Sequence, residues 1–126
     1  MKKENVLSKK HKGYFENIFM IEVSEYLFDP LTAFRNINLL LKKNGILWLS
    51  THFIYPQHPP KGLDYLRYTP AGVEKLLTEA GFEIVEHVPR VAENIDFTQA
   101  WSVEQMRGWK EFDNKIIGSL VKAKKR

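Results

Sequence analysis

The pattern of apolar residues along the chain predicts strands that alternate with helices. Short, mostly apolar runs at Phe15–Ile21 and Ile46–Thr51 are typical of strands buried in a sheet. Between these runs, apolar residues recur at helical spacing: Leu31, Phe34, Ile37, Leu40 and Leu41. A strand, a helix and a second strand within about 35 residues predict a βαβ unit with parallel strands.

Capping residues indicate where the helices begin and end. The Asp-Pro pair at residues 29–30 and the Thr-Pro pair at 69–70 each combine an N-cap with proline at the first helical position. The segment 42–45 (Lys-Lys-Asn-Gly) is expected to end the first helix, with cations in its last turn and Gly45 in the left-handed conformation. Gly81 is expected to close the second helix, whose apolar positions are Val73, Leu76, Leu77 and Ala80.

The second half of the chain completes one layered domain. A proline-rich loop runs from His52 to Thr69, and a third strand is predicted at Phe82–Val88. An amphipathic helix near residues 102–113 and a final strand at Ile116–Val121 follow. The sequence therefore predicts the α/β class, with about four strands and flanking helices, in a single domain 14–126 behind a basic segment 1–13.

Charge and composition exclude several classes of protein. The net charge is +4, and Lys and Arg gather at both chain ends, where they are expected to form solvated tails. Nucleic-acid binding is not expected, because no basic helix face with interleaved aromatic residues accompanies these tails. The absence of cysteine excludes disulfides and zinc–thiolate sites. No apolar run approaches the roughly 20 residues of a bilayer span, so we expect a cytoplasmic protein with no membrane partner.

Candidate chemistry lies just beyond the first two predicted strands. The seven glycines never fall as Gly-x-Gly, and no nucleophile elbow, P-loop or His-Glu-x-x-His motif is present. In open α/β sheets, ligands bind outside the carboxyl ends of parallel strands. This rule places Glu22, Glu25 and Tyr26 on one side of a candidate site, and His52 with the loop after it on the other.

These segments also carry a resemblance to a known family. Residues 15–30 (FENIFMIEVSEYLFDP) are similar to the Phe-Asp-x-x-x-x-x-Glu-Val-Leu-Glu-His-Leu-x-Asp-Pro stretch of class I S-adenosylmethionine-dependent methyltransferases. Residues 39–51 (LLLKKNGILWLST) resemble the passage from helix to strand in that family. The segments 55–60 (YPQHPP), 64–70 (DYLRYTP) and 77–82 (LTEAGF) resemble one branch of it, which often includes enzymes acting on sugars or other small metabolites.

The resemblance implies a partial Rossmann-like methyltransferase fold with an antiparallel last strand. It covers about residues 14–90 and corresponds to the distal, C-terminal half of the family fold. The other half would supply the glycine loop and the acidic residue that holds the cofactor ribose. The resemblance therefore implies a truncated or split methyltransferase that binds S-adenosylmethionine weakly or not at all as an isolated chain. The alternative is a catalytically degenerate α/β module kept for interaction or oligomerisation.

The family motifs also imply roles for individual residues. They suggest cofactor binding by Glu22 and Val23, acceptor binding by Glu25, Tyr26, His58, Asp64, Tyr65 and Tyr68, and catalytic roles for His52 and Arg67. In some relatives a Glu-x-x-Glu-His group coordinates a divalent metal. Tyr26 stands here at the histidine position, so no metal is expected. Glu16 likewise replaces the Asp of the Phe-Asp pair.

Several of these residues have a second interpretation. Glu22 and Glu25 either orient a substrate, hold Mg²⁺ through carboxylate oxygens, or cap the turn that follows them. His52 is either a general base or a hydrogen-bonded structural group. Arg67 either binds a substrate carboxylate or phosphate, or pairs with Asp64 three residues before it.

The first predicted strand also suggests association. Residues Phe15–Ile21 contain one charge, Glu16, and no proline, so nothing in the sequence blunts a free edge of this strand. In the family fold the strand lies inside the sheet, beside strands that the resemblance does not cover. We expect the edge to pair with a second copy in a homodimer, to meet a separate chain that supplies the missing half, or to be covered by the basic N-terminal segment.

Overall fold

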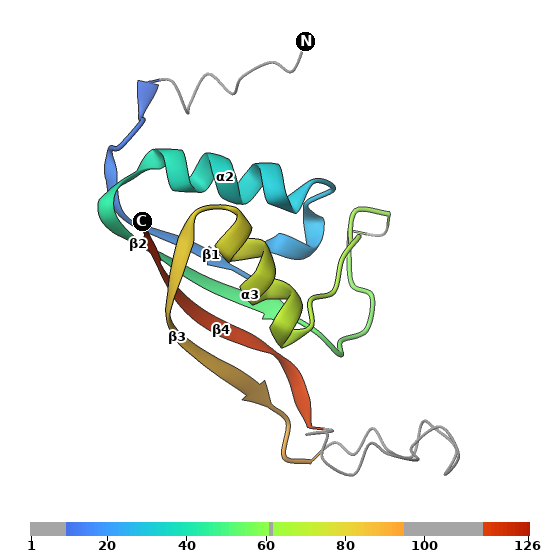
Figure 1. Ribbon diagram of the computed structural model, residues 1–126. Coiled ribbons are helices and arrows are strands. Elements are labelled where there is room, and N and C mark those ends of the chain that lie inside the picture. Colours follow the sequence, from blue (N-terminus) through green and yellow to red (C-terminus); the bar gives the residue numbers. More distant parts are fainter. Residues whose placement is uncertain (1–9, 61, 95–114) are drawn as a thin grey trace.

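Two helices cover one face of a four-stranded mixed sheet (Figure 1). The computed structural model describes residues 10–60, 62–94 and 115–126. The elements are β1 (Phe15–Ile21), the 3₁₀ turn η1 (Ser24–Tyr26), α2 (Pro30–Leu40), β2 (Leu41–His52), α3 (Pro70–Glu79), β3 (Phe82–Val91) and β4 (Ile116–Lys125). The strand order is β1-β2-β4-β3, with β1 parallel to β2 and β4 antiparallel to both of its neighbours. The predicted α/β class and antiparallel last strand are confirmed.

The predicted helix caps are present. The Asp29 side chain accepts a hydrogen bond from the Thr32 backbone N–H at 3.1 Å, and the Thr69 hydroxyl accepts one from Gly72 at 3.0 Å. Proline occupies the first turn of each helix, where its missing N–H leaves no hydrogen bond unmade. Gly81 follows α3 with a φ of 91°, the left-handed conformation that closes a helix.

The first helix ends earlier than the sequence analysis predicts. Helix α2 stops at Leu40 and β2 begins at Leu41, so the segment 42–45 does not form a last helical turn. The β1–β2 ladder pairs Phe15 with Leu41, then shifts register and resumes at Ile46. Residues 42–45 of β2 lie opposite the single residue Glu16 of β1, so β2 carries an insertion of three residues here. Strands β3 and β4 also run past their predicted ends, to Val91 and Lys125. The helix predicted near 102–113 lies outside the described residues.

The insertion also corrects the expected role of Gly45. The left-handed residue here is Asn44, with a φ of 63°, and not the glycine. A Cβ atom on Gly45 would lie 2.9 Å from the Lys42 carbonyl oxygen, closer than real Cβ contacts allow. Glycine is therefore needed at this position for close backbone approach and not for its backbone angles.

The core lies between the sheet and the two helices. Phe34 from α2 and Leu77 from α3 are fully buried, as are Leu47 from β2 and Phe82 from β3. The opposite face of the sheet carries no helix among the described residues, and none of the described helices is long and apolar enough to cross a bilayer. The loops that carry the candidate residues begin at the carboxyl ends of β1 and β2 (Figure 1).

Candidate functional site

Buried polar side chains gather where β1 and β2 end. Of the seven polar or charged residues that are buried in the described part of the chain, six lie in η1, the end of β2 or the loop after it: Ser24, Glu25, Ser50, Thr51, His52 and Asp64. Burial of polar groups is unfavourable unless partners compensate for lost water. The concentration of buried polar side chains at one end of the sheet therefore indicates a candidate functional site.

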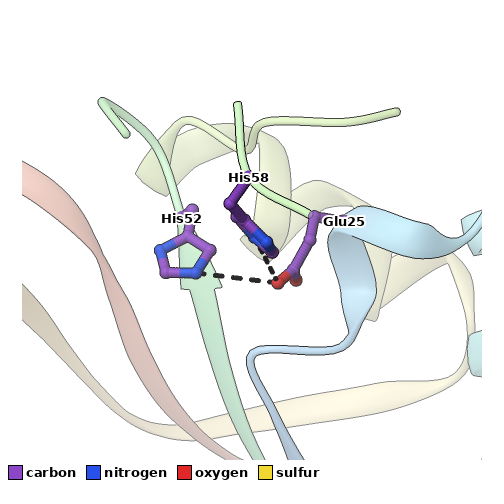
Figure 2. Close-up of side chains that lie close together, drawn as sticks. All are labelled: Glu25, His52 and His58. Carbon is purple, nitrogen blue, oxygen red and sulfur yellow. Dashed lines mark ion pairs between the residues drawn. The ribbon is translucent and has the colours of Figure 1, made fainter. Parts of the chain in front are cut away.

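Glu25, His52 and His58 converge at the centre of this region (Figure 2). The Glu25 Oε1 atom lies 3.6 Å from His52 Nε2 and 3.4 Å from His58 Nε2. Glu25 is completely buried, the His52 side chain is 4% exposed and that of His58 is 24% exposed. One residue comes from η1, one from the end of β2 and one from the following loop, so the cluster forms only when these three segments meet.

Glu22 lies beside the cluster in a strained backbone conformation. Its φ of 53° is uncommon for a residue other than glycine, and its N–H donates to the Ser50 hydroxyl at 2.9 Å. Its carboxylate pairs with Arg90 of β3 at 2.5 Å and lies 3.7 Å from His52 Nε2. No side chain caps η1, so the alternative that Glu22 or Glu25 caps the following turn is wrong.

The environment of His52 keeps its imidazole neutral. Burial lowers the pKa of His52 below its usual range, and this effect outweighs the opposing attraction from Glu22 and Glu25. The ring stacks on Tyr55, with centroids 4.2 Å apart. A neutral imidazole held in one orientation is able to accept a proton or bind a metal ion.

Backbone hydrogen bonds fasten the loop over the cluster. The Glu25 carbonyl accepts the N–H groups of Tyr65 and Leu66, and the His52 carbonyl accepts that of Tyr68. The Tyr68 hydroxyl donates to the Ser24 carbonyl at 2.8 Å. Burial raises the pKa of Tyr68 to about 12, so this hydroxyl keeps its proton and its donor role.

Arg67 and Asp64 form an ion pair that stabilises the loop after β2. Arg67 donates to both oxygens of Asp64, at 2.5 and 2.7 Å, which confirms the internal pair that the sequence analysis weighed against substrate binding. Further guanidinium N–H groups donate to the carbonyls of Tyr55 and Pro56. Asp64 also accepts the His58 backbone N–H at 2.9 Å, so the pair positions His58.

Replacing Asp64 with asparagine should lower the melting temperature at neutral pH by several degrees. The hydrogen bonds from Arg67 hold the pKa of Asp64 well below its usual 3.8. A carboxyl with a lowered folded-state pKa stabilises the fold above its unfolded pKa and loses that contribution as pH falls through the folded value. The difference between wild type and Asp64→Asn should therefore be full above about pH 5 and shrink toward about pH 2, as measured by circular dichroism melts.

Glu83→Gln is the matched control for this experiment. Glu83 pairs with Lys124 at 3.1 Å, but both side chains are substantially exposed, and exposed pairs contribute little. Its melting curve should stay close to that of the wild type at every pH. A pH-independent loss in Asp64→Asn would mean that the carboxylate charge does not hold the loop.

The structure brings together some of the predicted site residues and separates others. Tyr26 joins the cluster, because its hydroxyl lies 3.0 Å from His58 Nδ1. Val23 and Tyr65 are exposed outside it, with Tyr65 packed edge-on against Phe28. Sequence reasoning missed Arg90, because nothing marks a lone arginine near the end of a strand as a partner of Glu22.

Tyr55 was also missed as a member of the site. It precedes His58 by three residues within the segment 55–60, and its ring stacks on His52 and meets the His58 ring edge-on. The resemblance of the segment 55–60 to one branch of the family was the available signal for this residue.

Comparison with solved structures finds the same fold in methyltransferases. The chain is similar to an S-adenosylmethionine-dependent methyltransferase from Mesorhizobium loti, with a TM-score of 0.63 and 15% identity over 90% of this chain and 63% of that chain. For a methyltransferase from Archaeoglobus fulgidus the TM-score is 0.64, at 15% identity over 94% of this chain and 63% of that one. The chain thus spans less than two thirds of these proteins, and the predicted partial methyltransferase fold is confirmed.

The [4+2]-cyclase SpnF is similar as well, with a TM-score of 0.58 and 16% identity over 90% of this chain and 50% of that chain. At such identities the likeness is one of fold, and one fold hosts several chemistries. No protein-family model and no curated protein sequence matches the chain.

Proposed function

We propose that this chain forms the acceptor-binding part of an S-adenosylmethionine-dependent methyltransferase, with a small metabolite or sugar-type molecule as the acceptor. The observation that carries the proposal is the position of the buried polar cluster in a partial methyltransferase fold. Glu25 and His52 lie at the carboxyl ends of the parallel strands β1 and β2, where open α/β sheets bind their ligands.

Each side chain of the region has a part in this proposal. Glu22 and Val23, at the end of β1, face the cofactor, and the loop residues His58, Asp64, Tyr65 and Tyr68 enclose the acceptor together with Glu25 and Tyr26. Bound S-adenosylmethionine would supply the methyl group, and neutral His52 would take up the proton that the acceptor loses on methylation. Arg67 positions the loop, because its donors already bind Asp64 and backbone carbonyls.

A glycine loop for the cofactor is not part of this chain's sequence. No Gly-x-Gly occurs in the sequence, so this chain has no loop of the kind that lets a cofactor approach the backbone closely. We propose that a separate chain completes the cofactor site at the end of β1. Binding of S-adenosylmethionine by this chain alone should therefore be weak but located at the end of β1.

One observation favours an interaction module as the second candidate. Phe19, Ile21 and Leu120 expose apolar side chains on the face of the sheet opposite the helices. An apolar face of this kind is typical of association. A catalytically inactive module would keep this face and would have no use for the cluster.

Nuclear magnetic resonance titration with S-adenosylmethionine at millimolar concentration tests the proposal. The backbone amides of Glu22 and Val23 should shift, and Val23→Arg should weaken the shifts by blocking the approach to the end of β1. Val85→Arg is the control, because Val85 is similarly exposed (48% against 44% for Val23) but lies on β3. Shifts that are absent, or that lie elsewhere on the sheet, would overturn the proposed cofactor site.

A further inference from the structure

The spacing within the Glu25–His52–His58 cluster differs from that of hydrogen-bonded pairs. Elsewhere in the described chain, His87 Nδ1 meets Glu74 Oε1 at 2.6 Å, a normal hydrogen-bond distance. The two His–Glu distances in the cluster are 3.4 and 3.6 Å, too long for good hydrogen bonds. Two ligands of a tetrahedral zinc ion, each about 2.0–2.1 Å from the metal, lie about 3.3 Å apart. The observed separations are close to that value.

Several buried atoms of the cluster have no hydrogen-bond partner among the described residues. Both carboxylate oxygens of Glu25 and the Nε2 atom of His58 are buried and accept or donate no hydrogen bond among the described residues. Leaving a buried carboxylate without partners is strongly unfavourable, and buried charges in proteins are paired or coordinate metals. A cation between the three side chains would satisfy Glu25 Oε1 and His58 Nε2 together.

Hydrogen bonds on the far side of His58 favour a ligand tautomer. Its Nδ1 atom lies 3.0 Å from the Pro59 carbonyl oxygen, which only accepts, and 3.0 Å from the Tyr26 hydroxyl, which itself donates to Pro59. A proton on Nδ1 satisfies this arrangement and leaves the Nε2 lone pair facing Glu25. Two electron-rich atoms facing each other at 3.4 Å repel unless a cation lies between them. Metal-bound histidines commonly donate their other N–H to a carbonyl in this way.

We propose that Glu25, His52 and His58 bind a divalent transition-metal ion, with zinc as the best match, through one carboxylate oxygen and two imidazole nitrogens (Figure 2). Two histidines and one glutamate are a ligand set of catalytic zinc sites, which keep a fourth position open. Imidazole ligands favour zinc over Mg²⁺, which prefers oxygen. The absence of a histidine at position 26 does not exclude this site, because His52 and His58 come from other segments.

The ion would have both a structural and a chemical consequence. It would join η1, the end of β2 and the loop that carries His58, and so fix the loop over the site. Its open position would bind an acceptor oxygen or nitrogen and lower the pKa of that group, in place of proton removal by His52. Binding of the ion itself does not depend on methyl transfer.

Calorimetry with zinc chloride on tag-free, chelator-treated protein tests the site without S-adenosylmethionine. We expect one ion per chain, and a loss of affinity of more than about tenfold in both Glu25→Gln and His58→Ala. His87→Ala is the matched control, since it removes a histidine that pairs with a glutamate outside the cluster, and it should bind zinc like the wild type.

Cobalt(II) provides a second readout that reports ligand geometry. The cobalt-loaded protein should show the intense visible absorption of a tetrahedral site, and this absorption should disappear in Glu25→Gln. Unchanged zinc affinity in Glu25→Gln and His58→Ala, or equal losses in His87→Ala, would overturn the proposal. Circular dichroism of each variant confirms that it is folded, so that lost binding is not a result of unfolding.

Discussion

Replacing Glu25 with leucine should raise the free energy of unfolding of the metal-free chain by about 1–3 kcal/mol. The Glu25 carboxylate is completely buried, and neither oxygen has a hydrogen-bond partner among the described residues. An apolar side chain of similar size removes that desolvation cost. The backbone carbonyl of Glu25, which accepts the N–H groups of Tyr65 and Leu66, is unaffected by the change. Urea denaturation in the presence of a chelator measures the effect.

Glu22→Leu is the control for this stability measurement. Glu22 is partly exposed and pairs with Arg90, so its removal loses an ion pair and relieves no buried charge. It should leave the chain equally stable or slightly less stable. A decrease in stability in Glu25→Leu would mean that the carboxylate has a stabilising partner in the metal-free state. It would contradict the inference that the buried carboxylate lacks a partner without a metal ion.

An increase in stability on losing Glu25 would identify the residue as functional. Functional sites commonly reduce stability, because polar groups are kept there for binding or chemistry rather than for packing. The left-handed backbone of Glu22 is a second strained feature within the same segment. Both lie directly after β1, where the sequence analysis placed the candidate chemistry.

Local signals in the sequence predicted the elements of the fold well. Asp29 with Pro30, and Thr69 with Pro70, place both helix starts, because capping depends only on a few neighbouring residues. The end of α2 was wrong for a different reason. The pairing of β2 with β1 extends β2 back to Leu41. This long-range pairing overrides the local signal of the segment 42–45, which is typical of a helix end.

The site was predictable in its parts but not in its arrangement. Glu25 and His52 could be selected as candidates because they follow predicted strands. The pairing of Arg67 with Asp64 could be predicted because the two residues are three positions apart. His58 reaches Glu25 only because the loop folds back through hydrogen bonds to the Glu25 carbonyl and through the Asp64 side chain. The path of a proline-rich loop cannot be predicted from the sequence pattern, because the loop has no helical or strand periodicity.

Strand β1 leaves one edge without a strand partner in the described sheet. It pairs only with β2, and it lies at the end of the strand order. On the face opposite the helices, an apolar hollow of about 280 Å³ extends from β1 across the sheet to β3, and its lining includes Ile21, Trp48, Val88 and Leu120. Phe19 is 68% exposed and stacks on Trp48. A strand edge without protecting charges or proline, next to an apolar face, favours pairing with another strand.

Light scattering at micromolar concentration should therefore report about twice the chain mass of 14.8 kDa, with β1 of each copy paired antiparallel across a two-fold axis. Phe19→Lys should shift the protein toward monomer, because it places a charge beside the paired edge. Phe28→Lys is the matched control: Phe28 is 87% exposed but lies on the loop after η1, and its substitution should leave the mass unchanged. A wild-type monomer whose β1 amides are already protected from hydrogen exchange would contradict the dimer, because it would mean that a segment of the same chain covers the edge. A wild-type monomer with unprotected β1 amides would contradict it too, and would leave the edge free for the separate chain that completes the cofactor site.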